Sequence, residues 1–227
     1  MFNVKRSKFT LTKVNFHSPE VLRELQKIFY KKCYLCEDLV NNPDKEHFIA
    51  ISNDKTKEYD WNNLYYVCKR CNSIKKDVID KNNLQILDCC DEKINVSLAI
   101  KCLCSSIYNN NYIVEAQYDD EITKNTAFLL HHCYNADNAN YGISREFLHE
   151  QIFEKFVNFI NYRMVIKSKD SLQQDKNNAI EHLLNMSQDD YPFSVFWKWH
   201  ILCDPYLSAV FETKATKHHT NFRNDEI

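Results

Sequence analysis

The chain of 227 residues has one glycine, Gly142, and no long uninterrupted apolar run. Phosphate-binding loops of the P-loop and Rossmann types need several glycines at fixed positions, so the sequence excludes nucleotide binding by either loop. A membrane-spanning helix needs about 18 or more consecutive apolar residues, so we expect no membrane span and a soluble protein. Residues 1–6 lack the apolar stretch of a secretory signal, which favours a cytoplasmic location.

Cysteine, in contrast, is abundant, and four of the ten cysteines form two pairs with the spacing Cys-x2-Cys. Cys33 and Cys36 make the first pair, and Cys68 and Cys71 make the second. Four thiolates at this spacing can close a tetrahedron around one ion. The sequence therefore predicts a structural Zn²⁺ site on these four residues.

The six other cysteines lack this spacing, and we expect them to be reduced, small buried apolar residues. They are Cys89, Cys90, Cys102, Cys104, Cys133 and Cys203. The alternative is a second metal site, built from Cys102 and Cys104 together with His131 or His132.

The two parts of the chain differ in charge, although the formal net charge is only −2. Residues 1–76 hold 15 Lys and Arg against 9 Asp and Glu, a net of +6, whereas residues 77–227 hold 14 against 22, a net of −8. A basic N-terminal part favours an anionic ligand such as nucleic acid there. The acidic part is poorly suited to lie along a phosphate backbone.

The apolar pattern predicts short mixed elements first and mainly helices afterwards. Ser18 as N-cap and Pro19 at the first helical position predict a helix over residues 18–29. We then expect a strand at 45–51, a polar loop at 53–60 and a helix starting near Cys71. The later expectations are a β-rich segment at 96–118 with a turn at 109–111, helices at 120–134, 144–167, 171–186 and 193–203, and a tail at 216–227.

Glu46 and His47 lie between the two cysteine pairs and have the chemistry of a hydrolytic site. Histidine has an ordinary pKa close to neutral pH, so His47 is a candidate general base. Glu46 offers a hard oxygen ligand for Mg²⁺ or Mn²⁺. Neighbouring side chains of a strand point to opposite faces, so both residues can serve one site only if the strand ends or bends there.

Two asparagines nine residues apart complete the candidate site. Asn72, directly after the second cysteine pair, would give the divalent cation a neutral oxygen. Asn63 would hydrogen-bond to backbone across the loop and hold the strand of His47 in place; Asn62 is a weaker candidate for this position. Lys69, Arg70, Lys75 and Lys76 are expected to bind phosphate beside the site.

Together these residues resemble the HNH, or ββα-metal, endonuclease family. The shared features are Cys-x2-Cys, Glu46-His47, Asn63-Leu-x-x-Val-Cys68-x-x-Cys71-Asn72 and a following lysine. The resemblance implies that Glu46 and Asn72 bind the catalytic metal, that His47 is the general base and that Asn63 is structural. Glu46 stands where aspartate is commoner in the family, and Asn72 where histidine is common.

The motifs at residues 46–48, 59–64, 68–75 and 86–92 are similar to the HNH subfamily that includes PtuB, the nuclease of Septu and some retron antiphage systems. This resemblance covers roughly residues 30–92 and implies antiviral defence beside a PtuA-like ATPase, which we expect to bind the C-terminal helical half. Many relatives have Arg-Pro where this chain has Ile49 and Ala50.

The sequence thus predicts an α+β protein. Residues 1–92 would form a zinc-stabilised ββα-metal nuclease module, residues 93–215 a short β segment and a helical domain, and residues 216–227 a tail. The expected function is metal-dependent hydrolysis of phosphodiester bonds in DNA or RNA. The alternative is a non-catalytic zinc module that binds nucleic acid or a partner protein.

Overall fold

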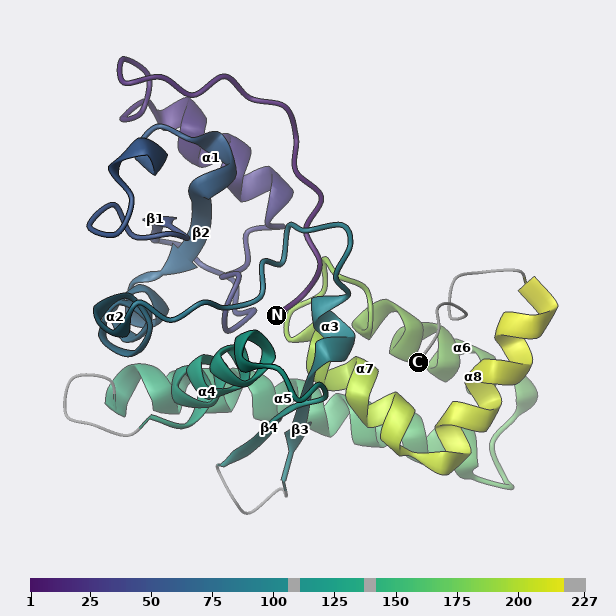
Figure 1. Ribbon diagram of the computed structural model, residues 1–227. Helices are drawn as coiled ribbons and strands as arrows, with labels where there is room; N and C mark the ends of the chain where they lie inside the picture. The colour runs from purple at the N-terminus through teal and green to yellow at the C-terminus, as the bar shows by residue number, and fades with distance from the viewer. Residues whose placement is uncertain (106–110, 137–141, 219–227) are drawn as a thin grey trace.

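The N-terminal part of the chain folds as a helix, a two-stranded hairpin and a second helix (Figure 1). The computed structural model describes residues 1–105, 111–136 and 142–218. The four elements are α1 (Pro19–Ile28), β1 (Pro43–His47), β2 (Leu64–Cys68) and α2 (Lys69–Val78). The strands are antiparallel, with Pro43 opposite Cys68 and His47 opposite Leu64. Short 3-10 turns lie at η1 (Lys55–Lys57), η2 (Trp61–Asn63) and η3 (Asp80–Asn82).

The helix predicted at 18–29 is confirmed as α1, which begins at Pro19. Proline suits the first helical position because its ring fixes φ and no intrahelical bond needs its missing N–H. Val21 and Leu25 are buried on the face toward the hairpin. Ser18 is the N-cap by position, but its hydroxyl makes no capping hydrogen bond.

Two boundaries near the cysteines differ from prediction. The strand expected at 45–51 ends at His47, because the chain turns there and the Asn63 side chain, rather than a neighbouring strand, binds the backbone of Ile49. The helix expected near Cys71 begins at Lys69, with Cys68 as its N-cap.

The C-terminal part is mainly helical, as predicted. After α3 (Val96–Ala99), a hairpin of β3 (Ile100–Cys104) and β4 (Tyr112–Ala116) leads into the helices. These are α4 (Glu121–Asn135), α5 (Gly142–Lys167), α6 (Gln173–Met186), α7 (Ser194–Cys203) and α8 (Pro205–His218). The turn predicted at 109–111 and most of the predicted tail lie outside the described residues, whereas α8 was not predicted. None of the helices within the described ranges could span a bilayer.

The two parts of the chain share one core, in which α2 packs against α4 (Figure 1). A fully buried carboxylate, Glu37, adds a polar link between them. It accepts a hydrogen bond of 2.9 Å from Ser194 at the start of α7 and lies 3.5 Å from Lys32 and 3.3 Å from the amino group of Met1. Burial raises the pKa of Glu37, but the ion pairs outweigh this and the net shift is downward.

Candidate functional site

The four cysteines with paired spacing lie together, and their sulfur atoms are all within 4.8 Å of one another. The sulfurs of Cys36 and Cys68 are 3.9 Å apart. Two thiolates bound to zinc at about 2.3 Å with tetrahedral angles stand about 3.8 Å apart, whereas a disulfide is about 2 Å long. The cluster of Cys33, Cys36, Cys68 and Cys71 could therefore hold a zinc ion.

The cluster joins three elements of the N-terminal part. Cys33 and Cys36 follow α1, Cys68 ends β2, and Cys71 lies in the first turn of α2, where its N–H donates to the sulfur of Cys68 at 3.4 Å. An ion bound here would fix the start of α2 against the hairpin. This junction places α2 beside the end of β1, where Glu46 and His47 lie.

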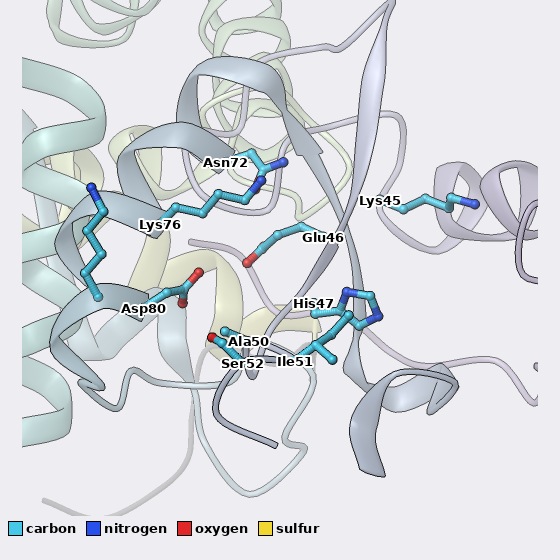
Figure 2. Close-up of a pocket in the computed structure, with 10 residues that line it drawn as sticks. Lys45, Glu46, His47, Ala50, Ile51, Ser52, Asn72, Lys76 and Asp80 are labelled. Carbon is cyan, nitrogen blue, oxygen red and sulfur yellow. The ribbon is translucent and has the colours of Figure 1, made fainter. Parts of the chain in front are cut away.

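A cleft of about 450 Å³ opens at this junction and includes Glu46, His47, Asn72, Lys76 and Asp80 in its lining. Figure 2 shows the Glu46 carboxylate directed into the space between Asn72 and Asp80, with the His47 ring on the other side of the strand. Glu46 and His47 are both among the residues that line the cleft, and β1 ends at His47. The sequence-predicted base and metal ligands thus share one cavity.

The His47 ring is held in a defined orientation. Its Nε2 lies 2.9 Å from the carbonyl oxygen of Glu58, and the ring stacks on Phe16 with 5.8 Å between centroids. A carbonyl oxygen only accepts hydrogen bonds, so we assign the ring proton to Nε2. The neutral ring then carries its basic lone pair on Nδ1.

Asn63 fastens the loop that follows His47. Its Oδ1 accepts from the N–H of Ile49 at 2.7 Å, and its Nδ2 donates to the carbonyls of Ile49 and Lys57 at 2.9 and 3.2 Å. The residue is 4 % exposed. These bonds restrict the chain immediately after His47, which is the contact pattern expected of a positioning residue.

Asn63→Ala is expected to lower the free energy of unfolding by about 2 kcal/mol, because three hydrogen bonds are lost and backbone groups lose their partners. Asn62→Ala is the matched control: Asn62 is exposed, and its hydrogen bonds with Arg6 and Asp60 use its backbone atoms. It should change stability by less than about 0.5 kcal/mol. Urea unfolding of both variants measures the difference, and equal stabilities would contradict the positioning role.

Glu46 is buried, at 4 % exposure, and both carboxylate oxygens have close neighbours. Tyr34 donates to Oε2 at 2.7 Å, and the ammonium of Lys75 lies 2.6 Å from Oε1. Burial raises the pKa of Glu46, and the ion pair with Lys75 offsets only part of that shift. A carboxylate has about four lone-pair positions, so these two contacts leave it able to bind a cation as well.

Asn72 also lines the cleft and carries a buried oxygen without a hydrogen-bond partner among the described residues. Its Nδ2 donates to Asp44 at 3.1 Å, whereas its Oδ1 is buried and makes no hydrogen bond with any described residue. A buried acceptor without a partner is costly, and a bound cation would satisfy it. The donor set of Glu46 and Asn72, all oxygen, fits a hard divalent cation such as Mg²⁺ or Mn²⁺.

The four basic residues expected to bind phosphate fall into two groups. Lys69 and Lys76 are exposed, and Lys76 lines the cleft. Lys75 is fully buried in ion pairs, and Arg70 donates to the carbonyl of Cys133 on α4. Phosphate binding was predicted for Lys75 and Arg70, but in the structure their charged groups contact other residues of the chain.

Several polar residues of the site were not predicted, among them Tyr34, Lys45 and Asp80. Tyr34 lies between the first two cysteines, and nothing in the local pattern indicates that its hydroxyl reaches Glu46. Lys45 lines the cleft and packs its ammonium over the ring of Phe16. Asp80 follows α2 and reaches back to Lys75; its position five residues after that lysine, just beyond the helix, was the available signal.

The alternative metal site at Cys102 and Cys104 is not formed within the described part of the chain. Among the described residues, Cys102, Cys104, His131 and His132 do not come close enough to share an ion, and the backbone of Cys104 instead donates to His200. Asp88, Cys89 and Cys90 do lie close together. The expectation that all six cysteines outside the four-cysteine cluster are buried holds for Cys89, Cys102 and Cys133, whereas Cys90 and Cys104 are half-buried and Cys203 is exposed.

The chain matches no protein-family model, curated protein or solved structure in three comparisons.

Proposed function

We propose that this chain is an HNH, or ββα-metal, endonuclease that hydrolyses phosphodiester bonds in nucleic acid. One observation carries the proposal: Glu46, His47 and Asn72 line a single cleft beside the four-cysteine cluster. The β-hairpin followed by α2 has the order of elements that the family name describes. The motif residues at 46, 47, 63 and 72 support the same assignment.

Two metals have different tasks in this proposal. Zn²⁺ on Cys33, Cys36, Cys68 and Cys71 holds α2 against the hairpin and takes no part in the chemistry. Glu46 and Asn72 hold Mg²⁺ or Mn²⁺. When bound, the divalent cation supplies positive charge that stabilises the negative charge developing on the phosphate.

His47 acts on the attacking water. Its Nδ1 accepts a proton as the water oxygen forms a bond to phosphorus, and the bond from phosphorus to the leaving oxygen breaks. Donation from Nε2 to the Glu58 carbonyl fixes the ring and stabilises the positive charge that the imidazole acquires. Asn63 keeps the following loop in place, and Lys69 and Lys76 attract the phosphate backbone.

We further propose a role in cytoplasmic antiviral defence beside a PtuA-like ATPase. Support comes from the motif resemblance and from the surface of the C-terminal part, which is acidic over residues 77–227. Helix α5 also exposes apolar side chains at Phe153, Val157 and Met164. Such a surface suits a protein partner better than a phosphate backbone.

The test is a cleavage assay with the zinc-loaded, full-length protein, with and without the ATPase. Substrates are supercoiled plasmid, single-stranded DNA and structured RNA, each with Mg²⁺, with Mn²⁺ or with neither. We expect cleavage of at least one substrate that depends on the added divalent cation. Binding without cleavage under every condition would contradict the nuclease proposal and favour a non-catalytic zinc module.

A further inference from the structure

Lys75 occupies a position that resembles a cation site. Its ammonium is fully buried and lies 2.6 Å from Glu46 Oε1, 2.7 Å from Asp80 Oδ1 and 3.3 Å from the backbone oxygen of His47. Two carboxylates and a carbonyl are the oxygen ligands that a hard metal ion uses. In this structure the chain's own ammonium group takes those contacts.

The ammonium remains charged at this position. Its ion pairs with the Glu46 and Asp80 carboxylates, at 2.6 and 2.7 Å, favour the charged form. A permanent positive charge next to Glu46 competes with any other cation for that carboxylate. It also repels a divalent ion placed between Glu46 and the unpaired oxygen of Asn72.

Asp80 provides a second partner for the same ammonium. It lies just beyond the end of α2, lines the cleft and has a side chain that is 15 % exposed, compared with 3 % for Glu46. A lysine side chain has four flexible carbon–carbon bonds, so a small movement can shift its charge from one carboxylate to the other. Lys75 can therefore leave Glu46 without becoming an unpaired buried charge.

We propose that Lys75 is an internal competitor for the Glu46 carboxylate and that Asp80 receives its ammonium when a divalent cation binds. Lys75 and Asp80 are thus positioning residues that set the affinity of the site for its metal. This inference rests on the proposed function of the cleft, but it concerns cation affinity and does not require cleavage.

The experiment measures Mn²⁺ affinity of the zinc-loaded, full-length protein without nucleic acid, by calorimetry and by the electron paramagnetic resonance signal of free Mn²⁺. Lys75→Gln removes the competitor and should bind Mn²⁺ about tenfold more tightly than the wild type. Asp80→Asn removes the alternative partner and should bind it about tenfold more weakly.

Lys76→Gln is the matched control, because Lys76 lines the same cleft with the same charge but is exposed. It should change the affinity by less than about threefold, since solvent screens exposed charges. The proposal would be overturned if Lys75→Gln and Lys76→Gln increased the affinity for Mn²⁺ equally. It would also be overturned if no variant bound Mn²⁺.

The double variant separates this role of Asp80 from direct metal binding. With Lys75 replaced by glutamine, Asp80→Asn should have little further effect, because there is no ammonium left to receive. An equal loss of affinity in both backgrounds would make Asp80 a metal ligand and overturn the proposal. If Lys75→Gln does not fold, wild-type affinity in Asp80→Asn overturns it independently. If His47→Ala still cleaved nucleic acid, the nuclease proposal would fail. The expected order of Mn²⁺ affinities among the Lys75 and Asp80 variants would be the same in that case.

Discussion

The His47→Ala variant is expected to cleave nucleic acid about 10²–10⁴-fold more slowly than the wild type, with its fold and zinc content unchanged. The Glu58 carbonyl engages Nε2, so the proton acceptor lost in this variant is Nδ1. The ring is half-buried at the end of β1 and its removal leaves the strand hydrogen bonds in place. Single-turnover cleavage rates, zinc analysis and circular dichroism check the three parts of the prediction.

His131→Ala is the control for the loss of a histidine. His131 is exposed on α4 and lies outside the residues that line the cleft. The His131→Ala variant should cleave nucleic acid at the wild-type rate. The assignment of His47 as the base is wrong if His47→Ala cleaves as fast as this control.

The Cys33→Ser variant is expected to lose most of its bound zinc and at least about 4 kcal/mol of unfolding free energy. Binding of a structural zinc ion contributes directly to folding, because the four ligands come together only in the folded chain. A serine hydroxyl is a poor zinc ligand at neutral pH. Zinc per chain, measured by atomic emission, and the thermal unfolding midpoint check this result.

Cys203→Ser is the matched control for this substitution. Cys203 is the exposed cysteine at the end of α7, outside the four-cysteine cluster. Its replacement should leave zinc content and melting temperature unchanged. Identical melting curves for Cys33→Ser and Cys203→Ser would show that the cluster does not stabilise the fold.

The cysteine cluster could be predicted because the spacing within each cysteine pair is visible in a short stretch of sequence. Each Cys-x2-Cys pair fixes two sulfurs within one turn of chain, and only the meeting of the pairs depends on the fold. Helices with strong apolar periodicity, such as α1 and α4, were also predicted to within one or two residues. Helix α8 was missed, although Pro205 at its first position and the apolar residues Leu207, Val210 and Phe211 mark it.

The different environments of Lys75 and Lys76 could not be predicted from composition, because the two are adjacent and chemically identical. Helical phase separates them: Lys75 follows Cys71 by four residues and Asn72 by three, and all three lie on the buried face of α2. The partners of Lys75 come from β1 and from the turn after α2, so they become apparent only once the chain has folded.

Glu37 couples the turn at the first cysteine pair to the start of α7 through a single side chain. It follows Cys36 directly and adopts a left-handed backbone conformation with φ of 59°, so its position depends on the turn that the first cysteine pair makes. Its carboxylate binds Ser194, 157 residues further along the chain. A change that moves this turn would therefore also displace the acceptor of the buried Ser194 hydroxyl.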